Sequence, residues 1–313
     1  MDCLNLRQDN DERLIILDWL TPFDYGAQQS DTISRRQNGT GQWFLDSPEF
    51  RALQKAELKT LFCPGIPGAG KTTLTSIVVD KLTEHFNNDD TVFVAYIYCN
   101  YRPKFSQGIA DLLASLLKQM AQHNYPLPES VKLLYDKHIN KRTRPSLDEI
   151  SKTLTLVATT FSKGFIIVDA LDECETSDGC RSRLLSEIFG LQKKCGLHFF
   201  ATSRFIPDIM AAFHGRASLE IRAAHEDVQK YVEERLKEPP LVLKHRADLR
   251  DDLVLGIVTT VDGMYAALYS RQENANFTQV FASKTASRFL NLKAKSEEDE
   301  GSTSSVTLRV RSI

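Results

Sequence analysis

The sequence has no long apolar stretch and no excess of charge of either sign. No apolar run approaches the about 20 residues that a membrane-spanning helix needs. The first five residues combine neither a basic region nor an apolar core, so no signal peptide is predicted. Lys and Arg number 39 against 41 Asp and Glu, which provides no general attraction to nucleic acid or to an anionic membrane. We therefore expect a soluble, cytoplasmic protein that binds neither.

Cysteine is sparse and lacks the spacing of a metal site. The six cysteines contain no C-x-x-C pair, so we expect free thiols in a reducing compartment rather than a structural disulfide or a zinc site. Cys174 and Cys180 flank a polar loop and are placed to pair on oxidation. The six positions are 3, 63, 99, 174, 180 and 195.

A glycine-rich phosphate-binding pattern is the strongest feature that is present. Residues 65–72 match G-x-x-x-x-G-K-[ST]. Glycines let successive backbone N–H groups point at phosphate oxygens. Lys71 is expected to reach the β- and γ-phosphates, and the Thr72 hydroxyl to bind Mg²⁺. The predicted nucleotide-binding residues are Gly65, Pro67, Gly68, Ala69, Gly70, Lys71, Thr72 and Thr73.

The pattern lies between a predicted strand at 58–63 and a predicted helix at 73–82, as the motif requires. Strands and helices then alternate, which predicts an α/β fold. Specifically, we expect a P-loop NTPase with a doubly wound parallel sheet of about five strands, followed by a small, incomplete helical domain. The further strands are expected at 91–98, 165–168, 198–201 and 219–221, and the helices at 109–122, 130–140, 146–161 and 181–194.

Four segments are predicted along the chain. The lead-in is expected to hold short helices at 13–20 and 48–58, the second capped by Ser47, on either side of a polar stretch at 28–42. Low-complexity composition predicts disorder at the end. The segments are a helical lead-in at 1–57, the P-loop domain at 58–222, a partial helical domain at 223–291 and a disordered tail at 292–313.

A second motif, Phe165-Ile166-Ile167-Val168-Asp169, has the Walker B pattern of an apolar strand that ends in an acid. Ligands lie at the carboxyl ends of strands in open α/β sheets, so Asp169 is expected beside Thr72 and Mg²⁺. The alternative is an aspartate that caps the next turn.

The residues after Asp169 bear on catalysis. Ala170 occupies the position at which a fast ATPase carries its glutamate base, and the acids appear instead at Asp172 and Glu173. Asp172 and Glu173, together with Arg204, are the predicted catalytic residues. A base must reach the attacking water, so acids displaced from the usual position predict slow hydrolysis. Alternatively, these two acids only complement a helix N-terminus.

Thr202-Ser203-Arg204 follows the strand expected at 198–201. Arg204 is expected to face the γ-phosphate, where it would report whether that phosphate is present. The alternative is an ordinary surface arginine. Residues 140–143 begin a guanine-binding N-K-x-D pattern, but Thr143 replaces the aspartate, so adenine is favoured.

With these motifs the chain resembles the NACHT family. More closely, it is similar to fungal NACHT proteins with a nephrocystin-type N-terminal P-loop domain, which are relatives of NOD-like receptors. Segments at 41–45, 168–174, 225–228 and 261–265 also resemble that group, over roughly residues 13–270. The resemblance implies a STAND-type NTPase that is ADP-bound at rest, and ATP-bound and oligomeric after a sensor domain releases it.

The chain departs from the family after about residue 270. The winged helix, its histidine and the repeats of family members have no counterpart, nor does an effector domain before residue 13. We expect a truncated paralogue or the product of a wrong splice junction.

The leading hypothesis is an Mg-ATP/ADP-binding switch of a NOD-like signalling protein, with slow or no hydrolysis, acting as a regulated scaffold. Its expected partners are further copies of itself or other signalling proteins. The alternatives are a P-loop kinase or metabolic ATPase, and a purely structural module.

Overall fold

The computed structural model describes residues 3–100, 108–174, 179–224 and 226–230. All of them lie in Met1–Lys244, the first of two compact units. Of the partial helical domain expected at 223–291, only 223, 224 and 226–230 are described, and 226–230 are helical. The remainder of the expected helical domain and the tail at 292–313 lie outside the described residues. Within the described ranges, no helix is long and apolar enough to cross a bilayer.

In the described part of the chain, five parallel strands form one sheet, which confirms the predicted α/β fold and the expected sheet of about five strands. Their order is β2-β3-β4-β1-β5. The first four are buried almost throughout, because their apolar runs are covered on both faces. The strands are β1 (Thr60–Pro64), β2 (Val92–Tyr98), β3 (Lys163–Asp169), β4 (His198–Ser203) and β5 (Ala217–Ser218).

The last strand begins earlier than the expected 219–221. Its ladder still reaches those residues, because the amides of Leu219 and Ile221 donate to Phe62 O at 3.0 Å and Pro64 O at 2.7 Å.

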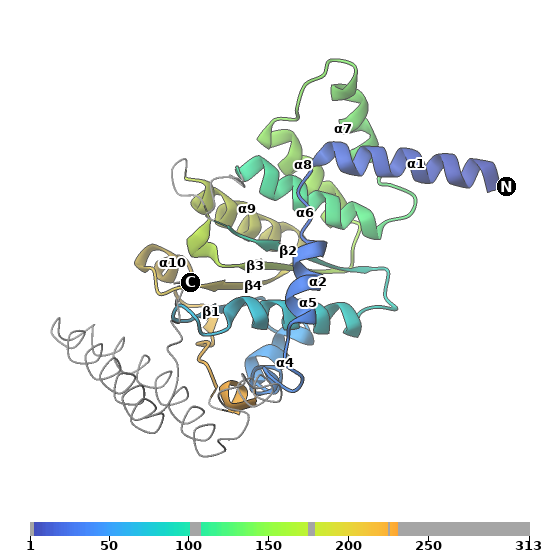
Figure 1. Ribbon diagram of the computed structural model, residues 1–313. Coiled ribbons are helices and arrows are strands. Elements are labelled where there is room, and N and C mark those ends of the chain that lie inside the picture. Colours follow the sequence, from blue (N-terminus) through green and yellow to red (C-terminus); the bar gives the residue numbers. More distant parts are fainter. Residues whose placement is uncertain (1–2, 101–107, 175–178, 225, 231–313) are drawn as a thin grey trace, which may run out of the picture. The chain divides into compact units, whose positions relative to one another are not determined.

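Helices cover both faces of the sheet, with α6, α8 and α9 on one side and α5 on the other (Figure 1). The four helices predicted after the phosphate loop helix are present to within a few residues, and α10 is a short helix that was not predicted. The helices are α5 (Lys71–His85), α6 (Ile109–His123), α7 (Glu129–Ile139), α8 (Leu147–Ala158), α9 (Cys180–Cys195) and α10 (Pro207–Ala212).

The lead-in belongs to the same core as the sheet. Leu17 of α1 and Tyr25 are buried in one apolar cluster with residues of β2, β3 and α6. Ser47 caps α4 as predicted and accepts a hydrogen bond from the Phe50 amide at 3.2 Å. That helix ends at residue 54, earlier than expected, where Ala56 takes a left-handed φ of 60°. The lead-in helices are α1 (Cys3–Leu20), α2 (Gly26–Ser34), α3 (Gln42–Leu45) and α4 (Pro48–Gln54).

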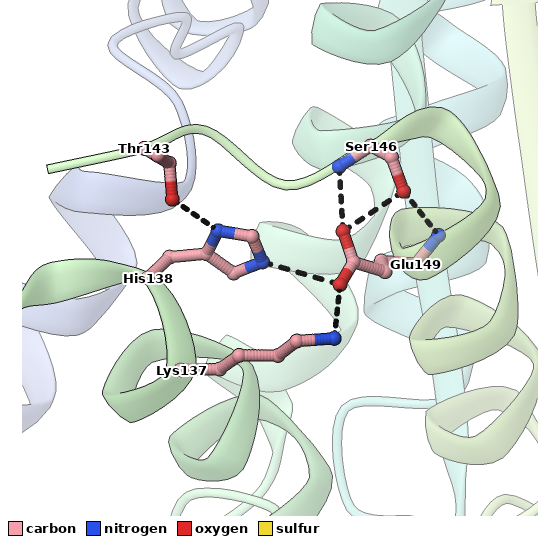
Figure 2. Close-up of polar contacts among 5 residues, drawn as sticks. All are labelled: Lys137, His138, Thr143, Ser146 and Glu149. Atoms are coloured by element: carbon pink, nitrogen blue, oxygen red, sulfur yellow. Dashed lines mark hydrogen bonds and ion pairs between the residues drawn. The ribbon is translucent and has the colours of Figure 1, made fainter. Parts of the chain in front are cut away.

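A polar cluster joins α7 to α8 (Figure 2). Ser146 caps α8 in a capping box with Glu149, which accepts hydrogen bonds from the Ser146 amide and hydroxyl at 2.8 Å each. Lys137 of α7 pairs with the other carboxylate oxygen at 2.5 Å, and a ring nitrogen of His138 lies 3.3 Å from it. These hydrogen bonds, chiefly those from Lys137 and Ser146, hold the pKa of Glu149 well below its ordinary value.

Candidate functional site

The glycine-rich loop links β1 to α5. Gly68 and Gly70 have left-handed φ values of 78° and 87°, which residues with a Cβ rarely adopt. Gly70 is the N-cap of α5 and has no side chain to bond the first helical amides. Pro67 is exposed, whereas Ala69 is buried. The loop therefore presents backbone N–H groups at a helix N-terminus, an arrangement that suits an anion.

Gly65 is required by a close backbone approach. A Cβ at this position would lie 2.5 Å from the carbonyl oxygen of Ile221, where the ladder beside β5 continues. The Gly65 amide donates to Ser203 O at 3.0 Å, so the loop begins in contact with the end of β4.

Lys71 folds back over the loop. Its Nζ donates to the carbonyl oxygens of Gly65 at 2.9 Å and Ile66 at 2.8 Å. Partial burial lowers the pKa of Lys71, and the charges of Asp172 and Asp169 act in the opposite direction. The ammonium is thus held in the mouth of the loop, with acidic side chains near it.

Asp169 ends β3 and is held by three threonine hydroxyls. Thr72 donates to Oδ2 at 2.7 Å, whereas Thr75 and Thr202 donate to Oδ1 at 2.8 and 2.6 Å. The side chain is buried, which raises the pKa of Asp169, and the three hydrogen bonds act to lower it. The structure therefore brings Asp169 and Thr72 together, as the two motifs predicted.

Thr75 and Thr202 are the members of this group that sequence reasoning missed. Thr75 lies three residues after Thr72, on the same face of α5, and that helical spacing is a signal that could have identified it. Thr202 could not be identified in this way, because its role depends on β4 lying between β1 and β3.

The lead-in also reaches the site. Tyr98 pairs in register with Asp169 across β2 and β3, and burial together with the charge of Asp169 raises the pKa of Tyr98. The Tyr98 hydroxyl donates to the side-chain oxygen of Gln29 in α2. The Gln29 amide nitrogen in turn donates to Ser76 O of α5 at 2.9 Å. One glutamine thus links the helix behind the loop to the strand beside Asp169.

Asp172 and Arg204, two of the three predicted catalytic residues, are paired with each other. The backbone amide of Arg204 donates to Asp172 Oδ1 at 2.8 Å, and the side-chain Nε of Arg204 donates to Asp172 Oδ2 at 2.5 Å. Burial raises the pKa of Asp172, but the hydrogen bonds and the charge of Arg204 outweigh it and leave the pKa below its ordinary value. Glu173 lies in the same 3₁₀ turn, η2 (Leu171–Glu173), and its charge also acts on Lys71.

The donor set around Asp169 suits a hard divalent cation. A threonine hydroxyl and a carboxylate are oxygen ligands, and Mg²⁺ is commonly held by one or two such side chains together with substrate phosphates. Among the residues that the structure describes, no group of three or more His, Cys, Asp or Glu side chains could hold a metal ion. Thr72 and Asp169 thus fit a cation that is shared with a phosphate ligand.

A cavity of about 260 Å³ lies between the lead-in and the segment after β5. The amide of Gly41 donates to Asp227 Oδ2 at 2.8 Å and ties the two segments together. A Cβ at Gly41 would meet Leu74 and Ile77 in the first turns of α5, so this region adjoins the helix of the phosphate loop. The cavity is lined by Gly39, Gln42, Trp43, Ala224, Glu226, Asp227 and Lys230.

Five cysteines are in the thiol form, namely Cys63, Cys99, Cys174, Cys180 and Cys195. Cys174 and Cys180 lie with their sulfurs 3.8 Å apart and are both buried. The hydrogen bond with Cys180 lowers the pKa of Cys174, but its bond with Cys99 and burial raise it to about 12. The Cys174 thiol is therefore neutral and a poor nucleophile at neutral pH.

Comparison with known proteins identifies a family. The family model described as "Nephrocystin 3, N-terminal" matches residues 39–204, which is more than half of the chain. The match includes the phosphate loop, Asp169 and Arg204. A search of the curated proteins found no match.

Several solved structures are similar to the chain. A DNA replication initiation factor has 15% identity and a TM-score of 0.41, and the match covers 76% of this chain and 63% of the factor. This chain therefore spans less than two thirds of the factor's length. DnaA from Aquifex aeolicus with bound AMPPCP has 16% identity and a TM-score of 0.35 over 71% of this chain and 62% of its own. A Walker-type ATPase of Pyrococcus abyssi has 13% identity and a TM-score of 0.42 over 84% of this chain and 79% of its own.

Proposed function

Since this chain belongs to the nephrocystin 3 N-terminal family, we propose that it is an Mg-ATP/ADP-binding P-loop module that works as a switch in a NOD-like signalling protein of the NACHT and STAND type. The observation that carries the proposal is the 2.7 Å hydrogen bond between the Thr72 hydroxyl and Asp169. It joins the last residue of the phosphate loop to the acid of the Walker B strand, which is the geometry that an Mg-nucleotide complex requires.

The phosphates would be held by the loop and by Lys71. The backbone amides of Gly68, Gly70, Lys71, Thr72 and Thr73 supply neutral donors at a helix N-terminus, and the Lys71 side chain supplies a positive charge close to them. Thr72 and Asp169 would hold Mg²⁺, which neutralises phosphate charge when it is bound. Lys71 already donates to two loop carbonyls, so it needs to exchange only these partners for phosphate oxygens.

Slow turnover follows from the pairing of Asp172 with Arg204. A carboxylate that accepts two hydrogen bonds from an arginine and has a depressed pKa is a poor general base. Ala170, at the position of the usual base, has no group that takes a proton. Arg204 would report the γ-phosphate by exchanging its Asp172 contact for a phosphate oxygen. This arrangement supports a switch that holds nucleotide rather than an enzyme that consumes it.

An adenine base would lie in the cavity beside Trp43. Gly41, between two residues that line the cavity, lies close to the first turns of α5, and the cavity presents an aromatic side chain on which a base can stack. Adenine is preferred because the guanine-binding aspartate is replaced by Thr143. In this proposal the protein is cytoplasmic, alternates between ADP- and ATP-bound states, and associates with copies of itself or with other signalling proteins, but not with nucleic acid or membrane.

Binding of fluorescently labelled ADP tests the proposal. The protein is expected to bind labelled ADP in the presence of Mg²⁺, and Lys71→Ala is expected to weaken binding at least about tenfold through loss of a charged phosphate contact. Lys81→Ala is the control, because Lys81 lies on the same helix and forms an ion pair with the exposed side chain of Glu84. Equal binding by Lys71→Ala and Lys81→Ala, or none by the wild type, would contradict the proposal. Rapid turnover of ATP on addition of small acceptor molecules would instead favour a kinase.

A further inference from the structure

The hydroxyl of Thr202 makes two hydrogen bonds at the end of β4. It donates to Asp169 Oδ1 at 2.6 Å and accepts from the backbone amide of Ala170 at 2.9 Å. Thr202 is fully buried, so neither bond competes with solvent. Val168 pairs with Ala201 in the sheet, so Asp169 and Thr202 follow at the same level of adjacent strands.

These two hydrogen bonds stabilise the turn at Ala170, which follows β3. Ala170 has a left-handed φ of 53°, a conformation that is unfavourable for a residue with a Cβ. The turn carries the chain from β3 into η2, in which Asp172 meets Arg204. Because the chain turns here, the buried Ala170 amide cannot bond a neighbouring strand. The Thr202 hydroxyl accepts its hydrogen bond instead.

The hydroxyls of Thr72, Thr75 and Thr202 donate to different oxygens of the Asp169 carboxylate. Oδ1 accepts from both Thr75 and Thr202, whereas Oδ2 accepts from Thr72 alone. Because Oδ1 is occupied on two sides, rotation of the carboxylate is restricted. The oxygen that remains directed at the phosphate loop is Oδ2.

We propose that Thr202 is a positioning residue of the metal site, which holds the Asp169 carboxylate so that Oδ2 faces Thr72 and a cation bound there. The inference rests on the proposed Mg-nucleotide function and assigns a role to a residue outside the phosphate loop and the Walker B strand. Thr202 does not touch the nucleotide in this account. It acts only through the orientation of Asp169.

The test compares Thr202→Val with Thr202→Ser, which keeps the hydroxyl. The readout is the Mg²⁺ concentration at which the affinity for labelled ADP is half-enhanced, measured alongside the ADP affinity in EDTA. Loss of a group that orients a metal ligand commonly weakens metal affinity about 10- to 100-fold. Thr202→Val is therefore expected to raise the half-effective Mg²⁺ concentration by at least about tenfold and to keep the EDTA affinity, and Thr202→Ser to restore the wild-type response.

Thr60→Val is the matched control. Thr60 is a buried threonine of the neighbouring strand β1, and its hydroxyl bonds the Gln192 side chain at the opposite end of the sheet. This variant is expected to respond to Mg²⁺ as the wild type does. Thr202→Ala is assayed in parallel, so that a folding defect of the valine variant does not decide the result, and it must show the same loss of Mg²⁺ response.

Two results would overturn the inference while leaving the proposed function intact. One is an Mg²⁺ response of Thr202→Val and Thr202→Ala equal to that of Thr60→Val. The other is an equal loss of ADP affinity with and without Mg²⁺, which would indicate a purely structural role. Failure of the wild type to bind ADP would instead overturn the proposed function, and this inference with it.

Discussion

At the scale of single residues, the glycines of the phosphate loop are present for two different reasons. Gly68 has a left-handed φ of 78° but no atom within 4 Å of a built Cβ, so only backbone conformation requires glycine there. Gly65 has no such φ, but a Cβ would lie 2.5 Å from Ile221 O. Space, rather than conformation, selects glycine at this position.

The two glycines therefore predict different costs of substitution. Gly65→Ala must displace the backbone at Ile221, and we expect it to lower the free energy of unfolding by about 1–3 kcal/mol. Gly68→Ala introduces only left-handed strain, which we expect to cost about 1 kcal/mol. Urea denaturation followed by circular dichroism compares the two variants. A Gly65→Ala protein as stable as the wild type would show that β5 and its continuation do not press against the loop.

At the scale of secondary-structure elements, polar contacts decide what the hydrophobic pattern leaves open. Most of helix α2 lies in the stretch at 28–42 that was expected only to be polar, and none of its residues is buried. It lies against α5, where Gln29 bonds Ser76 O and accepts from Tyr98. A helix that is polar on all sides carries no apolar periodicity, so its partners had to be known before it could be predicted.

The contact between α7 and α8 predicts a pH-dependent stability. The pKa of Glu149 is depressed in the folded protein, so its stabilising effect is present above the unfolded-state pKa of about 4.3 and is lost as the pH falls through the folded-state value. Glu149→Gln should therefore be less stable than the wild type at about pH 7, and the difference should narrow below about pH 4. Urea denaturation at a series of pH values measures it.

The control for this prediction is Glu129→Gln, which removes an exposed carboxylate from the first turn of α7. It should change stability little, because an exposed carboxylate on a helix surface contributes only weakly. A difference between Glu149→Gln and the wild type that stays constant down to acidic pH would contradict the assigned cause.

At the scale of the whole molecule, the lead-in is part of the folded core that contains the site. Phe44 is fully buried and packs its ring against those of Phe50 and Phe200, the last of which lies in β4. Leu17 and Tyr25 belong to the same apolar cluster as β2 and β3. Side-chain contacts therefore cross the predicted boundary at residue 57.

Removal of residues 1–57 should therefore abolish cooperative folding. The shortened protein would expose the apolar surface that Leu17, Tyr25 and Phe44 cover, and burial of each such side chain contributes about 1.5–3 kcal/mol. Chemical denaturation of the shortened protein, monitored by far-UV circular dichroism, is expected to show a broad transition or none. Ile15→Ala, at an exposed position of α1, is the control and should unfold as the wild type does. A sharp transition of the shortened protein would show that the P-loop domain folds alone.

The meeting of Thr72 with Asp169 was predicted from a rule of the fold class, that ligands lie at the carboxyl ends of parallel strands. The sequence by itself determined the phosphate loop and the alternation of strands and helices. These follow from local spacing, because glycine conformations, apolar periodicity and the end of an apolar strand are properties of neighbouring residues. Only the tertiary structure decided that β4 lies between β1 and β3, which brings Thr202 to Asp169 and Arg204 to Asp172. Strand order depends on pairing between segments distant along the chain, and no local pattern encodes it.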